Sequence, residues 1–326
     1  MRKDPIVLDV RQLQVSFTTP EGPVRALSGV SFQVGKGEVF AIAGESGAGK
    51  SVICRAIVNR LEPGASVRGE VRFNNQPMLD LGKTALRNLY AKEIAVLPQH
   101  ATALNPLLTI GEHLSETLSA HLPKMKAKVI RDRSIHLLET FGLRDAGRIY
   151  RAYPYQLSGG MQQRVLIALA YCCDPVLVVA DEPTKALDPV LKETMLETLL
   201  EIKSSRRASM VLVTHDLTVA HRLADHVGIL YQGRFMEKGK ARQVLEQSVH
   251  PYTRMLIRAM PENGLAPDLE VNVEAAQGDS HDGCPFQNRC RWGRDDAPHP
   301  YAARKIDDNH TVWCINALSQ QAFQDL

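Results

Sequence analysis

A glycine-rich run that ends in lysine and serine has the spacing of a phosphate-binding loop. Residues 44–51 read Gly-Glu-Ser-Gly-Ala-Gly-Lys-Ser, which fits the pattern GxxxxGK[ST]. Glycines in such a turn let backbone N–H groups point at a phosphate, and the helix that follows directs its positive end at the same anion. We therefore predict a nucleoside triphosphate site in which Lys50 reaches the β- and γ-phosphates and Ser51 ligates Mg²⁺. The predicted phosphate-binding set is Gly44, Glu45, Ser46, Gly47, Ala48, Gly49, Lys50 and Ser51.

Two adjacent carboxylates follow an apolar run later in the chain. Asp181 and Glu182 come directly after residues 176–180, and in a parallel sheet this position lies at the edge where a phosphate loop is found. We expect Asp181 to hold Mg²⁺ through its water shell and Glu182 to polarise an attacking water. His215 follows the next apolar run and can donate a hydrogen bond to the γ-phosphate from the same edge. A carboxylate at position 182 predicts hydrolysis and not binding alone.

The elements that must position these residues form an α/β core. Residues 38–43 read as a buried strand before the loop, and a helix is expected to start near Lys50. The apolar runs 175–180 and 210–214 flank a predicted helix over 189–203, which is typical of parallel strands covered on both faces. Such a core brings the ends of several strands, and the polar residues that follow them, to one edge.

Two further units are expected around this core. Residues 6–34 alternate short β-like runs with a turn at 20–23, which predicts an antiparallel β subdomain. From about residue 124 to 171 apolar residues recur at helical spacing, so we predict an inserted helical subdomain over about 100–172. Beyond Pro261 the composition becomes polar and loop-like, which places a boundary there.

Composition argues against several classes of partner. The chain has 326 residues and a formal net charge of +3, so there is no electrostatic case for nucleic acid or an anionic membrane surface. Its longest apolar runs fall short of the roughly 20 residues that a membrane-spanning helix needs. The first residues lack the long apolar core and small-residue cleavage site of a secretory signal, so we expect the protein to stay in the cytoplasm.

A second helix start carries glycines in residues 157–164. The order Leu-Ser-Gly-Gly-Met-Gln-Gln-Arg predicts that Ser158 caps a helix and leaves the Gly159 and Gly160 amides available to a phosphate. The segment resembles the LSGGQ signature of ABC ATPases, with Met161 at the fifth place, and the resemblance extends over most of the chain. In that family the signature faces the γ-phosphate held by a partner subunit. With a single phosphate loop here, the resemblance implies a dimer with an identical or paralogous ATPase that sandwiches ATP.

The resemblance assigns further site residues. Gln99 resembles the Q-loop glutamine, which touches the Mg²⁺ and water region, and Asp188 stands in a segment like the D-loop, residues 186–188. Gln163 is assigned to nucleotide binding with the signature, and Phe17 is the candidate for stacking on adenine. Lys185 replaces a threonine common in the family, and we expect this departure to be tolerated.

Other stretches narrow the resemblance to importers of oligopeptides and dipeptides, a branch shared with nickel importers. These stretches are residues 31–38, 103–112, 153–157 and 250–256, and none of them has an evident catalytic role. The resemblance implies a peripheral ATPase on the cytoplasmic face of the inner membrane, joined to two membrane-spanning permease subunits and, through them, to a solute-binding protein. The alternatives are the same role for nickel or another small solute, a non-transport ABC ATPase, and a regulatory module with an inactive site.

The expected organisation is a nucleotide-binding domain over 1–260 and an irregular, cysteine-containing extension over 261–326. Members of the peptide-importer branch often carry four cysteines in this tail that resemble a [4Fe-4S] ligand set. Here Cys284, Cys290 and Cys314 match, but the third position falls on Ala297. Three alternatives stay open: a cluster held by three thiolates with another ligand such as His299, a zinc ion, and a tail without metal.

Overall fold

The computed structural model describes residues 5–98, 103–185, 187–205, 208–260, 283–290 and 300–314. Five strands of its larger sheet run parallel, as the apolar runs predict. In spatial order they are β9 (His226–Tyr231), β3 (Val39–Ala43), β8 (Ser209–Thr214), β7 (Leu177–Asp181) and β6 (Ile94–Leu97). Every residue of β3 and β8 is buried, because both faces of the sheet are covered. Parallel pairing brings the carboxyl ends of β3, β7 and β8 to one edge.

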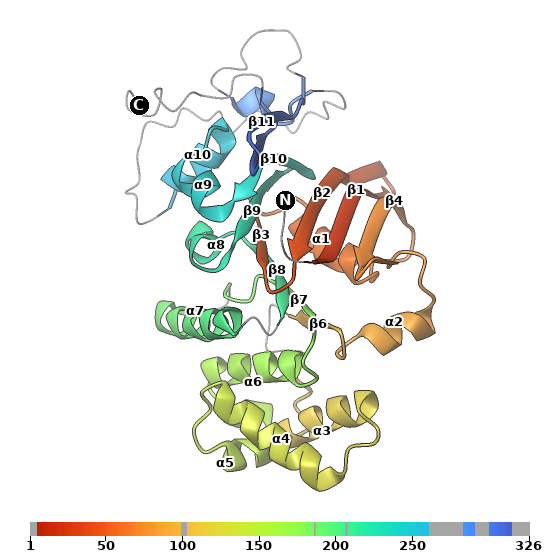
Figure 1. Ribbon diagram of the computed structural model, residues 1–326, viewed down its shortest axis with the longest axis vertical. Helices are drawn as coiled ribbons and strands as arrows, with labels where there is room; N and C mark the ends of the chain where they lie inside the picture. Colours follow the sequence, from red (N-terminus) through yellow and green to blue (C-terminus); the bar gives the residue numbers. More distant parts are fainter. Residues whose placement is uncertain are drawn as a thin grey trace.

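A smaller antiparallel sheet lies beside this core (Figure 1). Its strands, in spatial order, are β2 (Gly22–Gly35), β1 (Ile6–Thr19), β4 (Ala65–Phe73) and β5 (Gln76–Pro77). The hairpin is longer than the two short runs suggested, and its strands pair from Ile6 with Gly35 to Thr19 with Gly22. Helix α1 (Lys50–Ile57) contributes Ile53 and Ile57 to an apolar cluster shared by both sheets. Helix α2 (Lys83–Leu89) follows the small sheet.

Helices cover the other faces of the large sheet. The helical subdomain, in the lower part of Figure 1, comprises α3 (Ile110–His121), α4 (Ala127–Thr140), α5 (Ala146–Arg151) and α6 (Gly159–Tyr171). Thr109 starts α3 with a capping box, in which its hydroxyl accepts from the Glu112 N–H and the Glu112 carboxylate accepts from the Thr109 N–H. One apolar cluster joins this subdomain to the sheet and to α7 (Pro189–Ser204) and α8 (Leu217–Leu223). The four helices fall within the predicted helical insertion.

The C-terminal part has more regular structure than the sequence suggested. Strand β10 (Arg234–Lys240) is followed by α9 (Ala241–Glu246) and α10 (Pro251–Arg258), and then β11 (Arg304–Asp307) and β12 (His310–Val312) extend the large sheet. The full order is β11-β12-β10-β9-β3-β8-β7-β6. Strand β12 satisfies the free edge of β10, pairing with residues 237–239. In the part of the chain that the structure describes, no helix combines the length and hydropathy needed to cross a membrane.

A buried carboxylate ties this region together. Glu237 of β10 is fully buried and accepts hydrogen bonds from the Val249 and His250 N–H groups at 2.9 and 3.2 Å. Its third partner is the His310 Nε2, at 2.7 Å, from β12. A buried carboxylate is tolerated where several donors satisfy it. Glu237 therefore joins β10, the start of α10 and β12.

Candidate nucleotide site

The phosphate loop connects β3 to α1, as predicted. Gly44 has a φ of +153°, and a Cβ atom there would lie 2.1 Å from the Leu230 carbonyl oxygen. Gly49 has a φ of +99° and would bring a Cβ within 2.6 Å of the Ala26 carbonyl oxygen. Since backbone atoms cannot move aside cheaply, only glycine fits these two positions. The loop therefore follows the backbone of its neighbours closely before it turns into α1.

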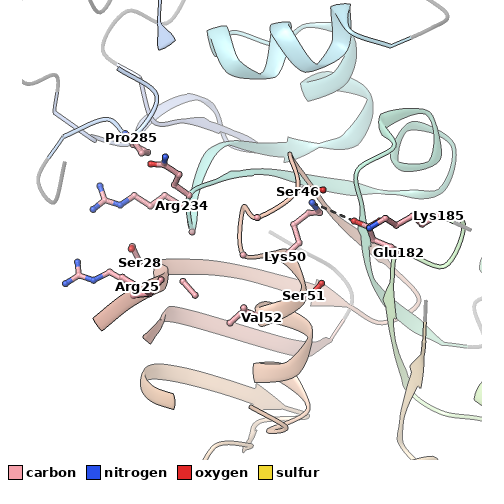
Figure 2. A pocket seen from close by; sticks show the side chains of 16 residues that line it. Arg25, Ser28, Ser46, Lys50, Ser51, Val52, Glu182, Lys185, Arg234 and Pro285 are labelled. Carbon is pink, nitrogen blue, oxygen red and sulfur yellow. Dashed lines mark ion pairs between the residues drawn. The ribbon is translucent and has the colours of Figure 1, made fainter. Parts of the chain in front are cut away.

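Lys50 lies at the centre of the loop. Its ammonium group donates to the Gly44 and Glu45 carbonyl oxygens at 2.8 and 2.9 Å, and it lies 3.8 Å from the Glu182 Oε1. Figure 2 shows Lys50 and Glu182 facing one another in the pocket. Only 5% of Lys50 is exposed, and burial lowers its pKa, although the carboxylates of Glu182, Asp181 and Glu45 oppose this. These partners hold the ammonium group in place, and a bound triphosphate would place further negative charge beside it.

Ser51 and Asp181 meet at the end of β7. The Ser51 hydroxyl donates to the Asp181 Oδ1 at 3.1 Å. Burial raises the pKa of Asp181, and the hydrogen bond from Ser51 only partly offsets this. Oxygen donors of this kind are the ligands that Mg²⁺ prefers, and a divalent cation would favour the ionised carboxylate. The two residues fit the predicted metal site.

Glu182 is the most constrained residue of the site. It is 7% exposed, its φ of +48° is left-handed, and its N–H donates to the Val213 carbonyl oxygen at 2.9 Å. The Oε2 lies 2.8 Å from the His215 Nδ1 and 3.5 Å from the Lys185 Nζ. Left-handed backbone costs roughly 1–3 kcal/mol for a residue other than glycine. The structure thus brings the predicted catalytic carboxylate and histidine together, and adds Lys185 to them.

A pocket of about 490 Å³ opens beside these residues. At one end lie Ser46, Lys50, Ser51, Glu182 and Lys185, and Figure 2 places Arg25, Arg234 and Pro285 on the opposite side. Phe17 is not among the described residues that line the pocket. It packs partly buried in the apolar cluster of the small sheet, across from Val24, which does line the pocket. Adenine stacking by Phe17 therefore stays a prediction that this geometry does not support.

The signature segment lies on the helical subdomain. Ser158 caps α6, accepting from the Met161 N–H at 3.4 Å, and Gly159 is exposed. Neither Ser158, Gly159 nor Gly160 lines the pocket of its own chain, as expected if the signature serves a partner. Gln163 is only 4% exposed, because it lies on the inner face of α6. Its side chain is covered by the protein, and its role in nucleotide binding stays a prediction.

Two more predicted residues have different outcomes. The Asp188 carboxylate accepts from the Val190 and Leu191 N–H groups, both at 3.0 Å, and so caps α7 outside the pocket. Gln99 lies outside the described residues, as does Ala186 of the D-loop-like segment. Their roles stay predictions from the resemblance.

The tail cysteines do not assemble into a metal site in the described residues. Cys284 and Cys290 pack with the apolar cluster around α10, whereas Cys314 packs with Val249 and Val312 in a separate cluster. Burial raises the pKa of Cys284, which favours the neutral thiol over the thiolate that a metal requires. No group of three histidine, cysteine or acidic side chains in the described ranges could hold an ion, and Ala297 and His299 lie outside those ranges. The described residues therefore give no support to a cluster or to zinc.

Comparison with known proteins agrees with the geometry. The chain is 39% identical to the dipeptide transport ATP-binding protein DppD of Bacillus subtilis (strain 168), over 94% of each chain. It is 36% identical to the oligopeptide transport ATP-binding protein OppD of Escherichia coli (strain K12), over 87% of this chain and 85% of the relative. Residues 27–185 match the ABC transporter family. This chain belongs to that family.

Within the ABC transporters, the C-terminal part is specific to one branch. Residues 236–296 match the oligopeptide/dipeptide transporter C-terminal region. Among solved structures, the dimeric post-hydrolysis ATP-binding cassette MJ0796 with ADP and Pi is 30% identical, with a TM-score of 0.64 over 72% of this chain and 99% of that one. The cbiO1 protein of Clostridium perfringens is 25% identical, with a TM-score of 0.62 over 80% and 97%. The protein is an ABC ATPase that uses ATP and Mg²⁺.

Sequence reasoning missed two residues of this ABC ATPase that hold the phosphate loop. The Tyr252 hydroxyl accepts from the Glu45 N–H at 3.0 Å, and Arg289 binds the Glu45 carboxylate. Tyr252 stands in His250–Leu256, a stretch that marked the importer branch without an evident role, and Arg289 stands in Cys284–Cys290, which was considered only for its cysteines. The resemblance of these two segments to the importer branch was the only hint in the sequence that they have a role.

Proposed function

We propose that this ABC ATPase drives the uptake of dipeptides or oligopeptides across the cytoplasmic membrane. The names of its relatives, which are dipeptide and oligopeptide transport ATP-binding proteins, support this substrate class. The match of residues 236–296 to the oligopeptide/dipeptide transporter C-terminal region supports it further. Nickel or another small solute is the alternative cargo, because the solute contacts other subunits and not this chain.

The contact between Glu182 and His215 is the observation that carries the proposed mechanism. Glu182 accepts the proton of the water that attacks the γ-phosphate, while His215 holds the carboxylate through its Nδ1 at 2.8 Å. Lys50 and the N–H groups of the loop stabilise the charge that builds up on the phosphate oxygens. The buried, left-handed position of Glu182 keeps its carboxylate aimed at the pocket.

Ser51 and Asp181 are the residues that would hold Mg²⁺, with Gln99 added by the family resemblance. When bound, the ion would neutralise negative charge on the phosphates. Asp181 must be ionised for this role; burial raises its pKa, and a bound cation would favour the ionised form. No step of the proposal uses an iron–sulfur cluster, because the described residues contain no group of three side chains that could hold a metal.

ATP is sandwiched between two subunits in the proposed working state. The loop of one subunit and the Ser158 helix end of an identical or paralogous ATPase would hold one nucleotide, with Asp188 near the joint. The dimeric assembly of the neighbouring cassette MJ0796 is compatible with this arrangement. We place the dimer on the cytoplasmic face of the inner membrane beneath two permease subunits, with residues 1–260 as the nucleotide-binding domain and 261–326 as its extension.

Replacing the proposed base tests the mechanism. In Glu182→Gln the side chain keeps its size but cannot take a proton, so hydrolysis should fall about 10²- to 10⁴-fold while ATP still binds. The measurement is ATPase rate beside equilibrium ATP binding. Glu197→Gln, at an exposed position of α7, is the matched control and should hydrolyse ATP normally. Wild-type turnover in Glu182→Gln would refute the assignment.

A second experiment addresses the cargo. The protein should co-purify with membrane-spanning subunits, and ATP hydrolysis by the reconstituted complex should rise with a binding protein loaded with peptide. Stimulation by nickel alone would favour the alternative cargo. A protein that never associates with permeases would favour a non-transport ABC ATPase.

A further inference from the structure

The C-terminal segment 283–290 docks against the back of the nucleotide site. Phe286 is 2% exposed and packs against Tyr231 and Tyr252, with ring centroids 5.4 and 5.2 Å apart. The Gly283 carbonyl oxygen accepts from Arg234 at 3.1 Å, and Pro285 lines the pocket itself. The buried aromatic ring fixes the segment in place, so the residues that follow it have a defined position.

Arg289 extends from this segment to the phosphate loop. Its two terminal nitrogens donate to the two carboxylate oxygens of Glu45 at 2.9 and 3.0 Å. The guanidinium also lies over the Tyr231 and Phe286 rings, 5.7 and 5.6 Å from their centroids, and is 19% exposed. The contact with Glu45 raises the pKa of Arg289. A bidentate pair on a stacked guanidinium is among the strongest charged contacts in proteins.

Glu45 is held at three points, which link the tail to Lys50. Its carboxylate binds Arg289, its N–H donates to the Tyr252 hydroxyl at 3.0 Å, and its carbonyl oxygen accepts from the Lys50 Nζ at 2.9 Å. The position of the lysine that meets the phosphates thus depends on a residue clamped from the C-terminal segment. Neither Glu45 nor Arg289 lines the pocket, so the effect is indirect.

The charge of Glu45 gives the clamp a second effect. An uncompensated carboxylate in a phosphate-binding loop would repel a triphosphate and would compete for Lys50. With Arg289 bound to both oxygens, this charge is neutralised within the protein. We propose that Arg289 is a positioning residue for ATP, which lets the C-terminal segment hold the phosphate loop in its binding geometry and cancel the charge of Glu45. The proposal rests on ATP binding at this loop.

Equilibrium ATP binding to the full chain tests the proposal. Arg289→Ala should weaken ATP binding about tenfold or more, because the loop loses a charged, bidentate contact. Arg289→Lys keeps the charge without the paired geometry, so its ATP affinity should lie between those of Arg289→Ala and the wild type. In the double variant Arg289→Ala with Glu45→Gln, affinity should be partly restored, since no bare carboxylate remains. Arg242→Ala, which breaks an exposed pair with Glu246 on α9, is the matched control and should bind normally.

The outcomes separate this proposal from the function it rests on. Wild-type affinity in Arg289→Ala, with binding lost in Lys50→Ala, would overturn the clamp and leave the nucleotide site intact. Equal weakening in Arg289→Ala and in the double variant would also overturn it, because a merely structural arginine would show no coupling to the charge of Glu45. Retained binding in Lys50→Ala would instead remove the phosphate-loop assignment.

Discussion

At the scale of single residues, each important side chain of the site is held in place by several contacts. Lys50 is buried among two carbonyl oxygens and a carboxylate, and Glu182 is held by a backbone contact and by His215. Lys185, expected only to be tolerated, contributes a second cation 3.5 Å from Glu182. These side chains are therefore already held in place by contacts within the chain.

Lys50→Ala should remove most nucleotide affinity. Without the ammonium group, the Gly44 and Glu45 carbonyl oxygens and Glu182 lose their cation and present negative charge to the triphosphate. Loss of a charged contact of this kind is expected to weaken binding by about 100-fold or more. Titration of the purified variant with ATP measures this, and affinity within a few-fold of the wild type would contradict it.

At the scale of elements, the start of α10 is a pH-sensitive point. His250 is 1% exposed, and its Nδ1 accepts from the Tyr252 N–H at 3.0 Å. Burial lowers the pKa of His250 from 6.5 to about 3. Below pH 6.5 His250 binds a proton in the unfolded chain, whereas in the folded chain it stays neutral down to about pH 3. The free energy of unfolding therefore falls as the pH drops through this window. For His250, each pH unit in this window lowers the free energy of unfolding by about 1.4 kcal/mol.

His250→Asn should remove part of this acid sensitivity. Asparagine also caps a helix through its side-chain oxygen, but it does not titrate. Between pH 6.5 and 5 the wild type should lose about 2 kcal/mol more of its free energy of unfolding than the variant. Urea unfolding at several pH values measures the difference. The control is His136→Asn, at an exposed position of α4, and parallel pH slopes for His250→Asn and wild type would contradict the prediction.

The elements also show what could be predicted from the sequence and what could not. The phosphate loop, Asp181, Glu182 and His215 were predictable because each depends on a local motif next to a buried strand. Tyr252 and Arg289 were not, because their contacts with Glu45 join residues 207 and 244 positions apart. Strands β11 and β12 are short and mostly polar, so their pattern does not differ from that of a loop. The burial of Gln163 depends on how α6 packs, which the motif does not specify.

At the scale of the whole molecule, the signature helix end and the phosphate loop of one chain lie apart. Ser158 caps α6 on the helical subdomain and does not line the pocket formed by the phosphate loop. Figure 1 shows α6 and α1 in separate parts of the molecule. Binding by one chain and hydrolysis by the assembly should therefore respond differently to changes at this helix end.

Ser158→Arg should separate the two activities. The isolated chain should bind ATP with an affinity within about twofold of the wild type, because its own pocket is unchanged, whereas hydrolysis by the assembled complex should fall about 100-fold. ATP binding and ATPase rate are measured on the same preparations. Thr140→Arg, on the same subdomain, controls for the added bulk and charge. Weaker binding and slower hydrolysis in equal proportion would place Ser158 in its own chain's pocket instead.

The pairing of β10 with β12 has a consequence for how the chain is made. Strand β10 gains its neighbour on this side only when Val312 pairs with Glu237, and the Glu237 carboxylate gains its third partner only from His310. Because synthesis proceeds from the N-terminus, the ribosome must deliver residues 310–312 before β10 gains this neighbour. Until then the nascent protein carries an open strand edge next to a half-satisfied acid, which is when it is most exposed to mispairing with other chains.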